Sequence, residues 1–286
     1  MALTYMLTYP EIDPIAFSIG PLSVHWYGIM YIVAFAGAWL LARWRASKTP
    51  DRWTSDQLSD LIFYGALGAV LGGRLGSALF YNFDRVLSDP LWLLRVWEGG
   101  MSFHGGFIGV MFAFYLYSRK LNRHWFDVLD FVAPLVPFGL GVGRLGNFIG
   151  GELWGRPTDA PWGMVFPHVD QFARHPSQLY QFALEGLVLF SLLWWFSSRP
   201  RPRYAVSGLF GIGYGCQRFF VEFFREPDVD IGYIAMDWLT MGQLLSLPMI
   251  FAGLALMVYA YRHPARGITV ERNHKQQKNR KNQHAN

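Results

Sequence analysis

Long apolar blocks separated by short polar segments constrain the fold of this 286-residue chain more than any other feature. Hydrophobic residues make up 52% of the sequence and charged residues only 16%, whereas soluble domains average about 25% charged. A helix needs about 20 apolar residues to span a bilayer. Blocks near this length occupy residues 22–42, 58–80, 102–117, 128–148, 178–196, 207–224 and 241–261. The expected fold is an all-α polytopic membrane protein with seven transmembrane helices.

The distribution of lysine and arginine predicts how the chain crosses the membrane. The connections after the first, third and fifth blocks, together with the tail, hold 17 of the 25 basic residues. The opposite connections hold five, and the other three lie inside blocks. Because basic residues concentrate on the cytoplasmic side, the N-terminus is expected outside and the tail in the cytoplasm.

The same pattern predicts the domain organisation. Residues 1–261 are expected to form one transmembrane domain, in which residues 149–177, rich in tryptophan and proline, form a small irregular cap over the outer face. The basic tail, residues 262–286, is expected to be disordered. It either contacts anionic lipid or only sets the topology. Nucleic-acid binding is not expected, because the basic residues form no folded patch with interleaved aromatics.

The segment at residues 139–155 reads GLGVGRLGNFIGGELWG and places Arg144, Asn147 and Glu152 among closely spaced glycines. Charged groups in apolar segments are costly and usually face a functional cavity. A guanidinium can bind phosphate oxygens through two parallel hydrogen bonds. The segment therefore indicates an anion site at Arg144, and the alternative is a structural ion pair with Glu152.

Two further arginines in the apolar blocks are also candidates for binding an anion. Arg218 precedes Glu222 by four residues, a spacing that favours an ion pair on one helix. This ion pair and a contact with phosphate are equally weighted alternatives for Arg218, and they are compatible with each other. Arg74 lies in Gly73-Arg74-Leu75-Gly76, which repeats the tetrapeptide around Arg144 and could meet the same anion. These polar groups converge on the outer half of the membrane.

His104 is the best candidate for a general base, since an imidazole can accept a proton at neutral pH. It precedes Gly105 and Gly106, which would let a substrate approach closely. The alternative is an ordinary polar residue at the membrane interface. Tyr27 has the same alternative, as an aromatic residue of the interfacial belt.

The run Gly143-Arg144-Leu145-Gly146-Asn147-Phe148, followed by Glu152 and Gly155, resembles the signature of the prolipoprotein diacylglyceryl transferases. Gly150 departs from the family pattern, which usually has asparagine there. The resemblance implies essential roles for Arg144, Asn147 and Gly155. It also covers further blocks along the chain, whose functionally important residues in this numbering are Tyr27, His104, Tyr214 and Arg218.

The resemblance implies an enzyme of the bacterial inner membrane, with its active site toward the periplasmic leaflet. Such an enzyme transfers the diacylglyceryl group of phosphatidylglycerol to the lipobox cysteine of a prelipoprotein, whose signal peptide it must bind, and releases glycerol 1-phosphate. This is the first step of lipoprotein maturation. No cofactor is expected, and the single cysteine, Cys216, excludes a cysteine-based metal cluster.

Two other function classes stay open at this point. Arginines within the membrane also line anion pathways in transporters and channels, although here the charges crowd toward one face. The third class is a non-catalytic protein that binds lipid.

Overall fold

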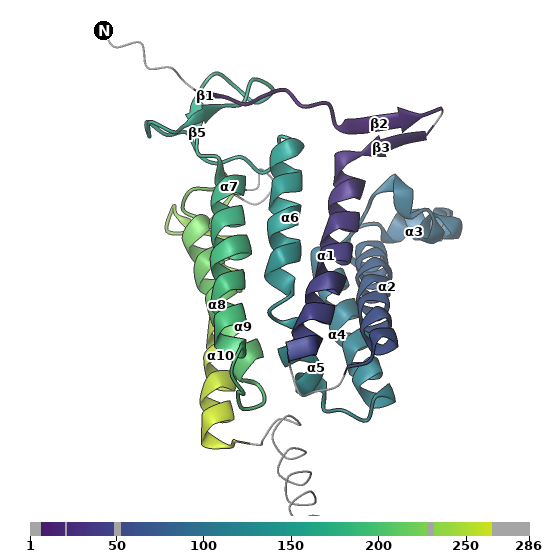
Figure 1. Cartoon of the computed structure of the whole chain (residues 1–286). Coiled ribbons are helices and arrows are strands. Elements are labelled where there is room, and N and C mark those ends of the chain that lie inside the picture. The colour runs from purple at the N-terminus through teal and green to yellow at the C-terminus, as the bar shows by residue number, and fades with distance from the viewer. Residues whose placement is uncertain (1–6, 21, 49–52, 228–231, 265–286) are drawn as a thin grey trace, which may run out of the picture. The chain divides into compact units, whose positions relative to one another are not determined.

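The computed structural model describes residues 7–20, 22–48, 53–227 and 232–264 (Figure 1). The predicted disordered tail therefore lies outside the described residues from position 265 onward. The chain divides into two compact units: Met1–Ala38 with Asp130–Asn286, and Trp39–Leu129.

The first unit is built around packed helices that are far apart in sequence. Helix α6 (Val136–Ile149) packs against a continuous helical run of α7 (Ser177–Gln181), the π-helical η3 (Phe182–Val188) and α8 (Leu189–Ser197) (Figure 1). Helix α9 (Ala205–Val221) packs along α10 (Met241–Arg262). The interior is apolar at Leu189 and Leu193, which are fully buried, and becomes polar toward the start of α7.

The block predicted as one helix over residues 128–148 is broken in the structure. Helix α5 (Trp125–Val132) and α6 meet at an angle of 49°. Pro134 lies in the break, where its ring prevents a continuous hydrogen-bond ladder. The carboxylate of Asp130 accepts bonds from the backbone nitrogens of Tyr204 and Ser207, both at 2.8 Å. It thereby caps the start of α9 from a distant part of the chain, at the end of the helix dipole that favours an anion.

The first apolar block also differs from the prediction at its start. Residues Leu22–His25 form strand β3, which pairs antiparallel with β2 (Ile15–Ile19), and helix α1 (Trp26–Lys48) begins only at Trp26. Leu22, Ser23, Val24 and His25 alternate apolar and polar, a pattern that is typical of a strand. Pairing with β2, which precedes the predicted block, stabilises these residues as a strand.

The predicted irregular cap contains a small sheet. Strand β4 (Met164–Val165) lies between β5 (Ala173–Arg174), to which it is antiparallel, and β1 (Leu7–Thr8), to which it is parallel. Tyr9 continues from β1 and donates from its hydroxyl to the carbonyl oxygen of Ile149 at 2.6 Å. Its ring stacks on the fully buried Phe166. A second hairpin, β6 (Tyr233–Ala235) with β7 (Leu239–Thr240), precedes α10. The fold is therefore mostly helical rather than purely all-α.

Each of the seven predicted blocks is helical over most of its length, but fewer qualify as membrane spans by length and composition. Among the described residues, α1, α2 (Ser55–Phe80), the run Ser177–Ser197 and α10 qualify. The bent pair of α5 and α6 makes a fifth if it is one span. Helix α4 (Phe103–Lys120) has two basic residues in its last turn, and α9 has only 17 residues. The structure thus supports a multi-pass membrane protein with four or five candidate spans.

In the second unit, α2 and α4 pack backbone to backbone through glycines. A Cβ atom added at Gly72 would lie 2.8 Å from the Cα of Gly109, and one added at Gly105 would lie 2.8 Å from the Cα of Gly76. Small residues spaced four apart permit such close helix contacts in membranes. Gly105, next to His104, therefore permits the close packing of α2 and α4. The sequence had instead suggested that this glycine lets a substrate approach.

We expect Gly72→Ala to lower the free energy of unfolding by about 1–3 kcal/mol, the usual cost of overpacking. Thermal unfolding in detergent solution measures this effect. Gly28→Ala is the matched control, because a Cβ atom there meets nothing within 4 Å. Equal melting temperatures for the two variants would show that α2 and α4 do not pack this closely.

Candidate active site

Arg144 is held by a buried acid from another helix. Its Nε donates to Oε2 of Glu185 at 3.1 Å, and the Glu185 side chain is fully buried within η3. The predicted alternative partner, Glu152, is exposed and does not form this pair. A π-helical segment widens the helix locally and is frequent at functional sites. Glu185 is a functional candidate that the sequence analysis missed, although an acid inside the apolar block 178–196 was a visible signal.

The second arginine is paired as its spacing predicted. Arg218 on α9 forms an ion pair with Glu222 four residues later. The same carboxylate accepts from the hydroxyl of Thr240 at 3.1 Å and pairs with Arg225 at 3.3 Å. Thr240 also caps α10. Glu222 is therefore fixed from three directions, and it orients Arg218 in turn.

Tyr214 links the two pairs. It lies one helical turn before Arg218 on α9, and its hydroxyl lies within electrostatic range of Arg144. The hydroxyl also lies within electrostatic range of Glu185 and Arg218. The structure thus brings together Arg144, Tyr214 and Arg218, which the sequence placed in separate blocks.

Both pairs retain unused hydrogen-bonding capacity. Among the described residues, Oε1 of Glu185 and Nη1 of Arg218 are buried without a hydrogen-bond partner. Buried polar atoms of side chains normally have at least one hydrogen-bond partner, either protein or ordered water. A cluster with two guanidinium groups and one unpaired donor can bind and stabilise a phosphate, because guanidinium stays charged and donates along fixed directions.

The remaining residues of the glycine-rich segment lie where α6 ends. Asn147 Nδ2 and Glu152 Oε2 are 3.5 Å apart, a marginal hydrogen bond. Gly155 lies between two backbones: its nitrogen donates to the carbonyl oxygen of His175 at 2.9 Å, and it bridges to Arg225. A Cβ atom at Gly155 would lie 2.5 Å from the carbonyl oxygen of Phe224. This close approach explains why only glycine fits there.

Arg174 ties the cap to the rest of the first unit. It is 8% exposed and donates to Asp170 (Nη2 to Oδ2, 2.5 Å), to Glu226 (Nη1 to Oε2, 3.1 Å) and to the carbonyl oxygen of Gly155 (3.1 Å). The hydrogen bond from Arg174 holds the pKa of Asp170 below its ordinary value of 3.8. The cap is thus anchored beside the glycine-rich segment by charge-assisted bonds.

We expect Asp170→Asn to lower the melting temperature at pH 7 and to lower it less at pH 3. Because the native pKa is lowered, the unfolded chain takes up the proton first as the pH falls, so the contribution of the pair is complete at neutral pH and decreases progressively below about 3.8. Thermal unfolding of both proteins at the two pH values tests this, with the exposed Asp159→Asn as control. A difference that persists undiminished at pH 3 would contradict it.

In the second unit, Arg74 is bonded to protein carbonyl groups. It is 3% exposed and donates to the carbonyl oxygens of Leu93 (3.2 Å) and Arg95 (2.7 Å), and also to those of Trp92, Gly99 and Gly100. Its guanidinium lies 3.7 Å from the ring centroid of Trp92. These carbonyl oxygens and the Trp92 ring stabilise the buried guanidinium of Arg74 without a lipid phosphate. The predicted phospholipid contact of Arg74 stays a prediction.

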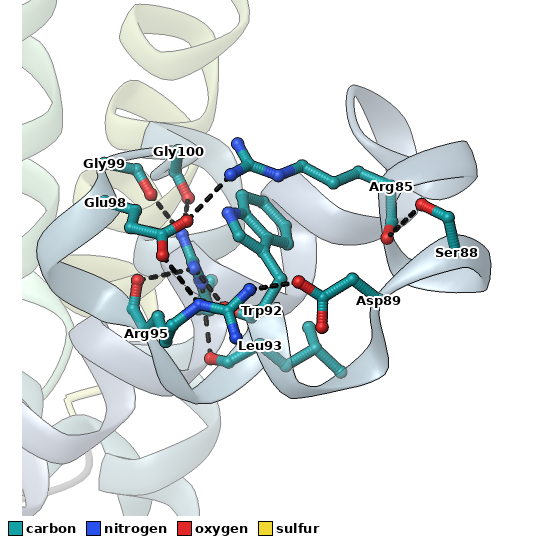
Figure 2. Close-up of polar contacts among 10 residues, drawn as sticks. Arg85, Ser88, Asp89, Trp92, Leu93, Arg95, Glu98, Gly99 and Gly100 are labelled. Carbon is teal, nitrogen blue, oxygen red and sulfur yellow. Dashed lines mark hydrogen bonds and ion pairs between the residues drawn. The ribbon is translucent and has the colours of Figure 1, made fainter.

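The segment around Arg74 is a compact group of short helices: α3 (Phe83–Ser88), η1 (Pro90–Leu94) and η2 (Val96–Glu98). Figure 2 shows Glu98 bonded to both Arg85 and Arg95, at 2.7 and 2.6 Å. Trp92 is buried in this group, whereas Trp97 is 76% exposed. Of these two tryptophans, only Trp97 is placed to contact a membrane interface.

His104 belongs to the second unit and lies in the first turn of α4. Its side chain is exposed, and its ring is edge-on to Phe103, with centroids 5.7 Å apart. Ser102 caps the helix by accepting from the nitrogen of Gly105 at 3.2 Å. The imidazole is accessible to a substrate.

Tyr27 belongs to the first unit, at the start of α1, and is 52% exposed. The hydroxyl of Tyr31 donates to that of Tyr27 at 3.4 Å. No cluster of three or more His, Cys, Asp and Glu suited to a metal occurs in the part of the chain that the structure describes.

Comparison with known proteins identifies the family. The profile of prolipoprotein diacylglyceryl transferase matches residues 14–259. Two similar proteins are called phosphatidylglycerol–prolipoprotein diacylglyceryl transferase. The one from Marinomonas sp. (strain MWYL1) is 61% identical to this chain, over 88% of this chain and 94% of the relative. The one from Acinetobacter baylyi is 62% identical, over 90% of this chain and 95% of the relative. The relative from Coxiella burnetii (strain RSA 331 / Henzerling II) is 59% identical, over 91% and 100%. This chain, with its paired arginines on α6 and α9, belongs to the prolipoprotein diacylglyceryl transferase family.

Proposed function

We propose that this protein transfers the diacylglyceryl group of phosphatidylglycerol to the lipobox cysteine of prelipoproteins and releases glycerol 1-phosphate, the first step of lipoprotein maturation. The observation that carries the proposal is the arginine cluster of the first unit. Arg144 and Arg218 are oriented by buried acids, and Nη1 of Arg218 has no partner among the described residues. Such preorganised donors suit the phosphate of an anionic lipid.

The reaction follows from the chemistry of the two substrates. The cysteine thiolate attacks the diacylglycerol carbon that bears the phosphate ester, since the thiolate is the competent nucleophile. A carbon–sulfur bond forms, the carbon–oxygen bond to phosphate breaks, and glycerol 1-phosphate leaves with the electron pair. The leaving group is already present in the lipid, so the displacement requires no activating cofactor.

The side chains have distinct roles in this scheme. Arg144 and Arg218 stabilise the charge on the departing phosphate, and the Tyr214 hydroxyl adds a polar group beside them. Asn147 orients the head group. His104 accepts the thiol proton. Glu222 acts by positioning Arg218, and Tyr27, Glu152 and Gly155 contribute to binding of the phospholipid.

We further propose the finer topology, with seven spans including α4 and α9, in the bacterial inner membrane. The asymmetry of 17 basic residues against five supports an N-terminus in the periplasm and a C-terminus in the cytoplasm. The active site then faces the periplasmic leaflet, where exported prelipoproteins arrive.

Reporter fusions at residue 286 are expected to report a cytoplasmic C-terminus. A fusion that is active only in the periplasm would contradict this topology and the periplasmic site. A control fusion after residue 168, in the cap, is expected on the opposite side.

The activity itself is tested with purified protein, phosphatidylglycerol labelled in its acyl chains and a peptide with a lipobox cysteine. We expect the label to move to the cysteine, with one glycerol 1-phosphate released for each peptide modified. Lipid binding without transfer would favour the non-catalytic reading. Movement of glycerol phosphate across proteoliposomes without transfer would favour a transporter.

A further inference from the structure

Gln181 is a buried polar side chain that the scheme above does not use. It is fully buried, and neither its amide nitrogen nor its amide oxygen has a hydrogen-bond partner among the described residues. Buried amide groups in native proteins are normally bonded to protein, water or ligand. An amide with both ends unpaired by protein has donors and an acceptor available to water or to a polar ligand.

The neighbours of Gln181 show which way its side chain faces. Gln178, Gln181 and Glu185 recur at spacings of three and four residues, so they share one face of the helical run. At one end, Gln178 donates to the carbonyl oxygen of Glu152 at 2.5 Å. At the other end, Glu185 accepts from Arg144. The face that carries Gln181 is thus turned toward α6 and the loop that follows it.

The antiparallel packing of α6 and α7 determines where Gln181 lies along the helix axis relative to Arg144. On α6, Asn147 lies three residues beyond Arg144 toward the cap, which is about 4.5 Å along the axis. On the facing run, Gln181 lies about one turn from Glu185 in the same direction. The two amides, Asn147 and Gln181, therefore lie at a similar level, one turn from the arginine that would bind phosphate.

We infer that Gln181 binds the glycerol head group of the lipid, and that it selects a phospholipid whose head carries neighbouring hydroxyl groups. This inference rests on the proposed function. An amide offers both donors and an acceptor, and hydroxyl groups match both. A phosphate only accepts hydrogen bonds and would leave the amide oxygen unpaired. In phosphatidylglycerol the diol is attached directly to the phosphate, so a site one turn from Arg144 matches the connectivity of the head.

The test compares two anionic lipids in detergent solution with a lipobox peptide: phosphatidylglycerol, and phosphatidylethanol, which has the same phosphate charge and no hydroxyl group. The ratio of kcat/KM values for the two lipids measures recognition of the diol. We expect wild-type protein to favour phosphatidylglycerol. In Gln181→Leu this preference is expected to fall by about tenfold or more, because the lost hydrogen bonds affect only the lipid that carries hydroxyl groups.

The control is Gln243→Leu, a fully buried glutamine that caps α10. It is expected to lower the melting temperature and leave the lipid ratio unchanged, as a purely structural residue would. If Gln181→Leu does not fold, Gln181→Asn keeps the amide but withdraws it by one methylene, and the ratio is expected to fall as well.

The outcomes separate the inference from the proposed function. A wild-type ratio in the folded Gln181 variant would overturn the inference, as would a wild-type protein that uses both lipids equally. Absence of transfer by wild-type protein from either lipid would instead overturn the proposed function on which the inference rests.

Discussion

Replacing Arg144 by lysine is expected to reduce lipidation of the peptide by about 10²–10³-fold, the usual effect of removing one preorganised donor from a transition state. Lysine keeps the positive charge and can still pair with Glu185, but it loses the planar guanidinium that binds two phosphate oxygens together. The Nε–Glu185 bond of 3.1 Å holds that plane in one orientation. Steady-state kinetics with labelled phosphatidylglycerol provide the measurement.

The matched control is Arg201→Lys. Arg201 also donates through Nε, to the carbonyl oxygen of Phe196 at 2.8 Å, and its guanidinium lies over the Phe196 ring. We expect this variant to retain near-normal turnover. If Arg144→Lys also turned over normally while remaining folded, the two-point contact with phosphate would have to be removed from the mechanism.

His104→Gln is the second substitution with a large expected effect, a loss of about 10²–10⁴-fold, as is typical when a general base is removed. The loss is expected to be recovered in part as the pH rises toward the range in which an ordinary cysteine thiol ionises, about 8.5. At that pH bulk solvent removes the proton from the substrate. Arg144→Lys is expected to show no such recovery, because phosphate stabilisation does not depend on the thiol proton.

A pH series of peptide lipidation for wild type, His104→Gln and Arg144→Lys distinguishes these roles. His263→Gln, at the exposed end of α10, is the control for loss of an exposed imidazole. A His104→Gln protein that is folded but does not recover at high pH would assign His104 to positioning lipid instead of accepting a proton.

Local patterns in the sequence were sufficient to predict several features of this protein. Blocks of about 20 apolar residues, the length that a bilayer selects, located the main helices of the described chain, although one block is divided into α5 and α6. The Arg218–Glu222 pair was predictable because four residues make about one helical turn, so both side chains project from the same face of α9. The family was indicated by a contiguous motif around Arg144, and it is confirmed by the matching profile and relatives. The roles assigned to the individual site residues stay predictions.

Contacts between distant segments required the tertiary structure. Arg144 pairs with Glu185, 41 residues away, and the sequence had suggested Glu152. Arg74 repeats the tetrapeptide of Arg144 but donates to carbonyl oxygens of the segment 92–100. The arginines of the two Gly-Arg-Leu-Gly tetrapeptides thus have different hydrogen-bond partners. Gly105 and Gly155 turned out to be required where other backbones approach them.

The physical reason for this division is the range of the interactions. Helix formation and pairs at a spacing of four depend on residues within one or two turns, so a sequence pattern specifies them directly. The partner of a buried charge depends on which helices pack together and in what register. That choice is made by apolar faces and glycine contacts spread over the whole unit, and the residues around Arg144 do not encode it. The sequence alone therefore determined where the helices and the charged residues lie, and the packing of α6 against α7 and η3 decided which acid holds Arg144.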